Sequence, residues 1–281
     1  PVAVGKFRRG NAEFEDIDCN VQVMRVASVE DGNLRFWSDP FYIKESGDLH
    51  FYRAGKELQD ITVFRKFSDN QELWLQKRMI NGVFEGCNDS TFSKKERLHI
   101  IRKLPKRLLV PVRPNKSGPY RYVRYAGPRY GFCNIADMYF YSIDGELLTG
   151  RPMGTPGSYG GDKEHDYLSA LDGNSSTSFD SKKYYHGWVG LDFGEPKHIG
   201  KIVYTPRNRD NHVRPGDEYG LFYCDGNWKS AGRVTASSDS ILYKGLPAGT
   251  LYILNNLSRG KDIRVFSYDN GVQEWDRPKK Q

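Results

Sequence analysis

The chain has 281 residues, of which 14% are aromatic and 29 are glycine, and its formal net charge is +7. This length suits two or three domains of ordinary size, and the scarcity of helix-forming runs argues against a helical bundle and favours short strands joined by turns. No segment approaches the roughly 20 apolar residues of a membrane helix, and the 42 Lys and Arg are interleaved with 35 acids, which favours a solvated basic surface over a nucleic-acid site.

Residues 1–57 alternate between apolar and polar side chains as in an antiparallel meander. Asp31-Gly-Asn33 and Ser46-Gly-Asp48 supply turn residues between the apolar runs. We expect a small β-rich unit here, either separate or packed as part of the next domain. Because Pro1 lies within strand-like sequence, we also expect the chain to be part of a longer protein.

Residues 58–145 form the second predicted domain. Its expected strands cover residues 61–67, 82–85, 98–102, 108–112, 120–125 and 135–141, and a short helix is expected at 70–79. In Tyr120-Arg-Tyr-Val-Arg-Tyr125 the side chains alternate strictly, and neither face is plainly the core.

Residues 146–281 form the third predicted domain, built of strands and loops. Residues 202–211 align without a gap to residues 61–70, at a spacing of 141. A Gly-centred turn and an aromatic strand follow each copy. Such a repeat indicates tandem domains of similar build.

The cysteines and histidines give little support to catalysis or metal binding. Cys19, Cys87, Cys133 and Cys224 show no CxxC spacing, so a Cys87–Cys133 bridge and isolated buried thiols are the two alternatives. The six histidines form no HExxH pattern, and no Gly-x-Ser-x-Gly elbow is present. We expect a chain that is not an enzyme.

Several motifs recur in the order of a known family. They are Ala170-Leu-Asp-Gly-Asn174, Phe179-Asp180, Gly190-Leu-Asp-Phe-Gly194 and Pro206-Arg207, preceded by Tyr120-Arg-Tyr-Val-Arg-Tyr125 and Asn134-Ile-Ala-Asp137. This order resembles the discoidin, or coagulation-factor C-type, domain, a galactose-binding-like jelly roll. More closely, the chain is similar to the C-terminal portion of secreted Bacteroidetes proteins that place such modules after a transglutaminase-like domain.

The resemblance implies an all-β chain of tandem galactose-binding-like jelly-roll β-sandwiches behind the small N-terminal meander. It also implies a structural Ca²⁺ near Asp172, Asn174 and Thr177, for which a second acid is needed. The late Ala-Glu pair that supplies this acid in the family is replaced in the third section by Ile263-Arg264, although Asp262 is a possible substitute. The alternative is an Asx-type turn capped by Asp172.

The resemblance further implies a sugar site. Arg207 and Asn211 would grip ligand hydroxyls and Asp180 would contact the sugar, since planar donors and acceptors match vicinal hydroxyls. Tyr184 and Tyr185, with Trp188 nearby, would supply an aromatic platform. The alternatives are a structural ion pair of Arg207 with Asp210 or Asp217, and a core position for Trp188.

We therefore expect a non-catalytic glycan-binding region, monomeric and extracytoplasmic, within a larger exported protein. The alternative function is that of structural spacers or protein-docking domains that position an upstream catalytic domain. A third hypothesis is that an anionic polymer binds through Arg121, Arg124 and Arg129. Insertion into a membrane is not expected.

Overall fold

Short apolar runs separated by glycine turns produce a chain of antiparallel strands, which we describe from a computed structural model. The structure describes residues 3–9, 11–15, 17, 23–67, 70–260 and 263–275. Within this part of the chain, helical structure is limited to α1 (Asn70–Lys77) and the 3-10 turns η1 (Tyr159–Gly161), η2 (Lys163–His165) and η3 (Tyr167–Ala170). The expected all-β class is confirmed, and so is a short helix near residue 70.

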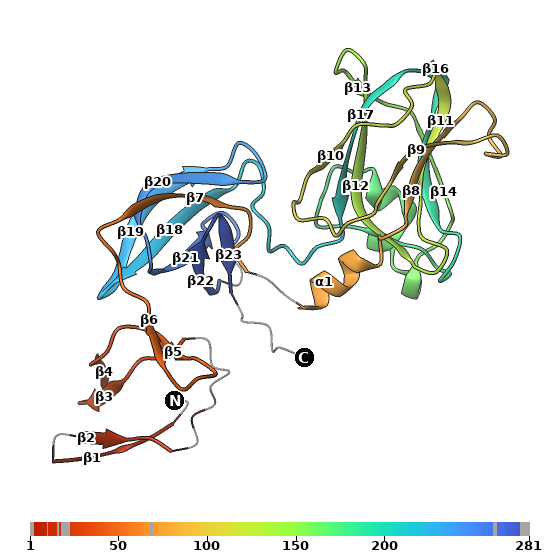
Figure 1. The fold of residues 1–281 in the computed structure, drawn as a ribbon. Coiled ribbons are helices and arrows are strands. Elements are labelled where there is room, and N and C mark those ends of the chain that lie inside the picture. The colour runs from red at the N-terminus through yellow and green to blue at the C-terminus, as the bar shows by residue number, and fades with distance from the viewer. Residues whose placement is uncertain are drawn as a thin grey trace. The chain divides into compact units, whose positions relative to one another are not determined.

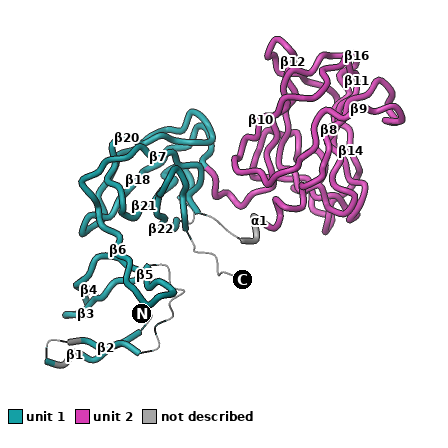
Figure 2. Tube along the Cα trace, viewed as in Figure 1, with its two compact units in different colours: residues 1–68, 213–281 teal, residues 69–212 magenta. Residues whose placement is uncertain are grey.

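The chain divides into two compact units, and one of them is discontinuous in sequence (Figure 2). Unit 1 comprises residues 1–68 and 213–281, and unit 2 comprises residues 69–212. Unit 2 is thus inserted between β7 (Leu58–Val63) and β18 (Glu218–Asp225), as the ribbon in Figure 1 shows.

Unit 2 is built from two antiparallel sheets. The strand order of the first is β14 (Arg151–Gly154), β16 (Trp188–Lys197), β11 (Tyr120–Ala126), β8 (Val83–Cys87) and β9 (Glu96–Ile100). The order of the second is β10 (Val110–Val112), β17 (Ile199–Pro206), β12 (Cys133–Ser142) and β13 (Leu147–Leu148), and β15 (Phe179–Asp180) also pairs with β12. The result is a β-sandwich.

The core of unit 2 lies between these sheets. Leu98, Val123, Tyr125 and Phe140 come from three different strands, β9, β11 and β12, and are all fully buried in one cluster. The opposite face of β11 is also covered, because Tyr122 packs there in a smaller cluster with Cys87, Phe92, Met153 and Trp188. Residues 120–125 therefore contribute to a cluster on each face, which explains why the alternation did not mark one face as the core.

Unit 1 contains one five-stranded antiparallel sheet and a separate strand pair. The sheet order is β19 (Asn227–Thr235), β18, β21 (Leu251–Asn256), β22 (Val265–Asp269) and β23 (Val272–Glu274), and β20 (Ile241–Pro247) pairs with β7. Tyr219, Tyr252, Phe266 and Ile61 are fully buried in the shared core. Long-range pairing of β7 with β20 thus closes the unit around the insertion.

The N-terminal segment forms three hairpins. They are β1 (Lys6–Arg8) with β2 (Asn11–Glu13), β3 (Ala27–Glu30) with β4 (Asn33–Phe36), and β5 (Phe41–Ile43) with β6 (Leu49–Phe51). The β3–β4 turn has Asp31 and Gly32 at φ 51° and 79°, the conformation that Asp-Gly pairs favour. Tyr42 and Tyr52 pack with Cys224 and Leu251 in unit 1. The expected meander is therefore present as three separate two-stranded sheets rather than as one sheet.

The units differ from the domains expected at 1–57, 58–145 and 146–281. The boundary at residue 145 falls inside unit 2, where β12 before it pairs with β17 after it, from Ile135 opposite Pro206 to Ser142 opposite Ile199. The two repeat segments also lie in different units, with residues 61–67 around β7 in unit 1 and residues 202–211 around β17 in unit 2. Local similarity therefore did not reveal which strands pair.

Cys87, Cys133 and Cys224 are buried free thiols, so Cys87 and Cys133 form no disulfide, and Cys19 lies outside the described residues. Isolated thiols, one of the two alternatives, are confirmed for these three. Among the described helices, none has both the length and the apolar character needed to cross a membrane.

Candidate functional site

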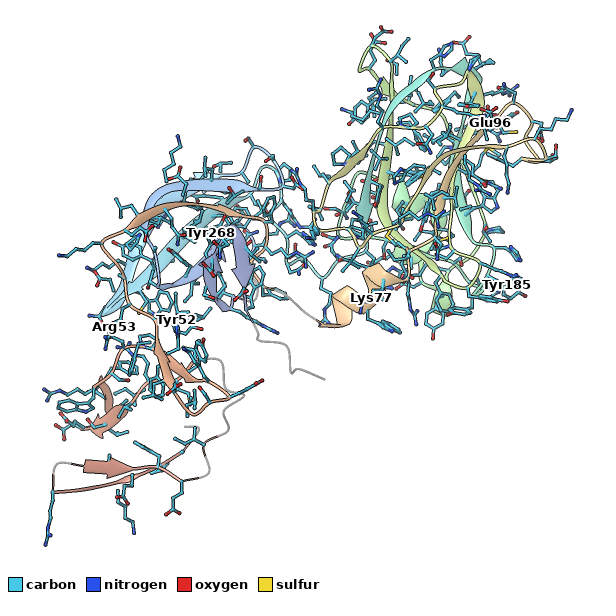
Figure 3. All side chains as sticks on the ribbon, viewed as in Figure 1. Tyr52, Arg53, Lys77, Glu96, Tyr185 and Tyr268 are labelled. Atoms are coloured by element: carbon cyan, nitrogen blue, oxygen red, sulfur yellow. The ribbon has the colours of Figure 1, made fainter. Side chains whose placement is uncertain are left out.

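Two loops that are distant in sequence, residues 127–132 and 181–187, meet at one end of unit 2. The loop after β11 bonds to the loop before β16 through Gly127 N to Gly187 O (2.9 Å) and Gly131 N to Tyr184 O (3.1 Å). Ser181 N, after β15, donates to Phe132 O at 2.8 Å. Figure 3 shows Tyr185 at this end of unit 2, where these loops join the strands. The backbone therefore holds these loops in place.

An ion pair occupies the polar centre of this end. Arg207 donates to Asp180 Oδ2, and Asn134 Nδ2 donates to Asp180 Oδ1 at 2.7 Å. The Asp180 side chain is 5% exposed, whereas that of Arg207 is 29% exposed. Arg207 N also donates to Asn134 O at 3.0 Å. Asp180 therefore orients a guanidinium that still faces solvent in part.

The electrostatics around Arg207 favour a neutral or partly anionic ligand. Burial lowers the pKa of the Arg207 guanidinium, and the charge of Arg78 lowers it further. An arginine remains protonated under such shifts. Arg207 thus pairs with one buried carboxylate and lies near a second cation, and the rest of its N–H donors can serve acceptors such as hydroxyl oxygens.

An exposed aromatic rim lies beside this ion pair. The Phe132 ring centroid is 4.9 Å from that of Tyr159 and 5.0 Å from that of Tyr184, and Tyr184 stacks on Tyr130 at 6.4 Å. Tyr130, Tyr159 and Tyr184 are 63%, 62% and 47% exposed. Rings that remain this exposed are available to a ligand.

Arg78 connects the rim to the ion pair. Its guanidinium lies 3.6 Å from the ring centroid of Trp74 and 5.7 Å from that of Phe132, and its charge acts on Arg207. Trp74 is 51% exposed. The aromatic rim, defined as Trp74, Tyr130, Phe132, Tyr159 and Tyr184, therefore borders two cationic groups.

Some of the expected site residues meet here and others do not. Asp180, Arg207 and Tyr184 come together, and Tyr185 is 49% exposed on the same loop with its ring against His186. Asn211 is fully buried, so its side chain is not presented to solvent. Trp188 is half-buried against Phe92, with ring centroids 5.8 Å apart. It therefore packs against a buried cluster, in line with the alternative that Trp188 has a structural role.

The ion-pair partner of Arg207 also differs from the structural alternative that was considered. Asp217 accepts from Asn256 Nδ2 at 2.8 Å and from Arg259 Nε at 2.6 Å in unit 1. Asp180 pairs with Arg207 instead. The aromatic loop Arg129-Tyr-Gly-Phe132 was a sequence signal for the rim, but nothing local showed that it would meet residues 180–187.

The loop around Asp172 forms an Asx-type turn, which was the alternative to a calcium site. Asn174 N donates to Asp172 Oδ1 at 2.8 Å, and Thr177 Oγ1 lies 2.8 Å from Asp172 Oδ2 and 2.7 Å from Asn174 O. Asn174 Oδ1 in turn accepts from Ser176 N at 3.1 Å. These oxygens are clustered as a cation would require, but they already bond to one another.

The second acid near this loop is Asp137 on β12, which sequence reasoning missed. Its carboxylate accepts from Met138 N at 2.9 Å and from the Tyr139 hydroxyl, and the backbone of Gly173 bonds to it. Burial raises the pKa of the Asp137 carboxyl to about 7, against those hydrogen bonds and with a smaller contribution from the charge of Asp172. The Ala136-Asp137 pair, rather than Ile263-Arg264, is therefore beside the loop, and Asp262 lies outside the described residues.

The chemistry available at this pair of acids is limited. Asp137, Asp172 and the oxygens of Asn174 and Thr177 are the groups that could hold a hard cation, which needs about 6 to 8 oxygens. In the part of the chain that the structure describes, no three His, Cys, Asp or Glu side chains gather closely enough to hold a metal ion. Backbone carbonyls and water would have to complete a calcium shell.

Comparisons with known proteins found no matching family model, no matching curated protein and no matching solved structure.

Proposed function

We propose that unit 2 is a non-catalytic carbohydrate-binding module of the galactose-binding-like jelly-roll type, and that it binds a glycan between the aromatic rim and Arg207. The observation that supports this most strongly is the set of exposed rings beside a guanidinium oriented by a buried carboxylate. The apolar face of a pyranose packs against an aromatic ring, while its hydroxyls accept from fixed planar donors.

Preorganisation supports the same function. Because Asp180 is bonded by both Arg207 and Asn134, the guanidinium does not need to be ordered when ligand arrives. The rim is exposed, so a sugar would bury little area. We therefore expect weak affinity, with a Kd from roughly micromolar to millimolar.

A structural calcium ion is a further part of the proposal. Asp172, Asn174, Thr177 and Asp137 would contribute oxygens to it, with backbone carbonyls and water. The ion would neutralise the two carboxylates and stiffen the loop of residues 172–177. We further propose that the chain is an extracytoplasmic, monomeric region of a larger exported protein.

The test is a glycan array followed by calorimetry on any sugar that binds, with three variants. Tyr184→Ala removes an exposed ring at little cost in folding, and Arg207→Lys keeps a charge beside Asp180 but loses the planar donor. Both should weaken binding. Arg233→Ala removes an exposed arginine on β19 of unit 1 and should leave binding unchanged. Unaltered affinity in both site variants would show that the sugar binds elsewhere.

A docking function has its own supporting observation, on the β3–β4 hairpin of unit 1. Val29, Leu34 and Phe36 share one face of the hairpin and are 72%, 64% and 47% exposed, which forms an apolar patch suited to a protein partner. If an upstream domain of the same polypeptide covers this patch, amide exchange of residues 27–37 should slow in the longer protein. Equal exchange rates in the two proteins would count against docking there.

A further inference from the structure

One stretch of this chain departs from the interleaving of acids and bases. Between Glu96 and Asp137 there is no Asp or Glu. The Lys and Arg residues in the same interval are Arg97, Arg102, Lys103, Lys106, Arg107, Arg113, Lys116, Arg121, Arg124 and Arg129. Such a run places unbalanced positive charge on the part of unit 2 that it forms.

The three arginines that sequence reasoning selected for anion binding have other contacts. Arg121 pairs with Asp192 at 2.8 Å, and Arg124 pairs with Glu85 at 2.7 Å while only 13% exposed. Arg129 lies 5.4 Å from the ring centroid of Tyr130. The first two hold the first sheet of unit 2 together, so their charges are already paired with acids of that sheet.

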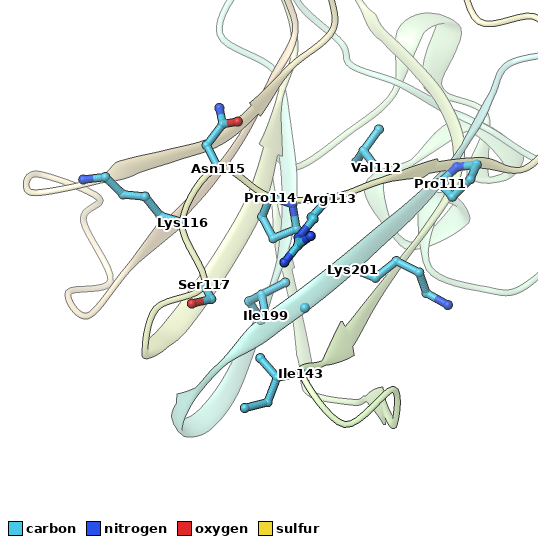
Figure 4. A pocket seen from close by; sticks show the side chains of 11 residues that line it. Pro111, Val112, Arg113, Pro114, Asn115, Lys116, Ser117, Ile143, Ile199 and Lys201 are labelled. Carbon is cyan, nitrogen blue, oxygen red and sulfur yellow. The ribbon is translucent and has the colours of Figure 1, made fainter.

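Six of the remaining cations, together with Lys201 of β17, line two adjoining pockets on β9, β10 and the loops around them. One pocket of about 760 Å³ includes Arg113, Lys116 and Lys201, as Figure 4 shows. The other, of about 520 Å³, includes Arg102, Lys103, Lys106 and Arg107. Pro111 and Val112 line both pockets, and no acid lines either. We name these seven cations the basic strip; all of them are exposed.

Two of these cations lie next to the end of one strand pair. The β10–β17 register ends with Val112 opposite Ile202, so Arg113 follows the end of β10 and Lys201 precedes Ile202 on β17. Lys201 lies 4.0 Å from the ring centroid of Tyr141. Both cations line the same pocket, so an anion bound there would be attracted by both charges.

Several cations of the strip have contacts of their own. Lys116 pairs with Glu96 at 3.1 Å, and Arg102 donates to Asn81 Oδ1 at 3.2 Å. Among the described residues, no ion pair neutralises Lys103, Lys106 or Arg113, so their charges are available to a ligand.

The basic strip is separate from the glycan site. The aromatic rim gathers where β11 ends and β16 begins, whereas residues 113–117 lie where β11 begins and β16 ends. Glu96, the partner of Lys116, and Tyr185 lie at opposite ends of unit 2 in Figure 3. A ligand of the strip would therefore not compete for Arg207.

We propose that the basic strip binds a polyanionic polysaccharide, a sugar chain that carries sulfate or carboxylate groups. Two joined pockets suit an extended chain, and seven cations without lining acids suit repeated anionic groups. A nucleic acid fits less well. Single-stranded chains bind through exposed rings on which bases stack, and the only Tyr, Phe or Trp in the linings is Tyr204, which is 3% exposed.

The test uses a fluorescent heparin oligosaccharide as the probe and measures anisotropy with the whole chain over a salt series. Wild type should bind, and its affinity should fall steeply between about 50 and 200 mM salt. The paired variant Lys103→Glu/Lys106→Glu should bind at least about tenfold more weakly, because it replaces two exposed attractive charges by repulsive ones. Arg113→Glu should weaken binding in the same direction.

The matched control is Lys44→Glu/Lys56→Glu, which changes the net charge equally at exposed positions of unit 1. It should retain most of the heparin affinity. No binding by wild type, or equal losses in the control and strip pairs, would overturn the proposal. Tighter binding of single-stranded or duplex DNA of matched charge would overturn the choice of polysaccharide. Because strip variants should keep any neutral-glycan binding and Tyr184→Ala should keep heparin binding, failures of the two sites can be told apart.

Discussion

Asp137 provides a test of the acid pair beside the 172–177 loop. In the metal-free protein, burial raises the pKa of its carboxyl from 3.8 to about 7, so the folded state holds a proton that the unfolded state has released. Between these values the folded chain binds more protons, and the free energy of unfolding therefore falls as pH rises. The difference between the two pKa values corresponds to about 4 kcal/mol in the free energy of unfolding. Of this contribution, roughly 2 to 3 kcal/mol is lost between pH 5 and pH 8.

Asp137→Asn supplies a neutral side chain of the same shape and should remove this dependence. Amide exchange of β12 reports the stability of unit 2 and is measured in chelator for both proteins at each pH. Comparing the two proteins at the same pH cancels the effect of pH on the intrinsic exchange rate. We expect the variant to gain protection relative to wild type as pH rises toward 8. If the two proteins keep a constant ratio of exchange rates across this range, the reasoning about Asp137 is refuted.

Three further predictions concern stability. Gly190→Ala should destabilise unit 2 by about 3 kcal/mol or prevent folding, because the added carbon would lie 2.1 Å from Val123 O. The control is Gly131→Ala, whose added carbon has no neighbour nearer than 3.5 Å, and urea unfolding should show a much smaller loss of stability for it. Leu98→Ala should cost about 2 to 5 kcal/mol because its side chain is fully buried, and a loss under about 1 kcal/mol would contradict the described core. Calcium should raise the melting temperature of wild type but not of Asp172→Asn, and equal values in calcium and chelator would exclude the ion.

The sequence allowed the strand content to be predicted, because strands leave local signals. Strands near residues 83–87, 120–126 and 133–142 follow from alternation and turns. The order of motifs selected Arg207 and Asp180 as site residues, but it did not predict that they pair with each other. Burial of Asn211 could not be read from its position on a loop. Side-chain exposure depends on what packs above it, and local pattern does not report this.

Long-range pairing accounts for the other differences. Asp137 and Asp172 are on opposite sides of the predicted boundary at residue 145, yet the pairing of β12 with β17 and β15 places them in one sandwich. The same pairing joins Phe132 to the 180–187 loop and completes the aromatic rim. An overall count of acids and bases likewise concealed the acid-free interval before Asp137, which an inspection of the charge distribution along the chain would have found.

The most direct test of the central claim is titration calorimetry of a glycan selected on the array, with wild type, Tyr184→Ala and Arg233→Ala compared under the same conditions. Loss of a ring that contacts the sugar should cost about 1 kcal/mol or more, or roughly fivefold to tenfold in Kd. The account predicts that loss for Tyr184→Ala alone. Equal affinities in all three proteins, or no glycan bound at all by folded wild type, would contradict it.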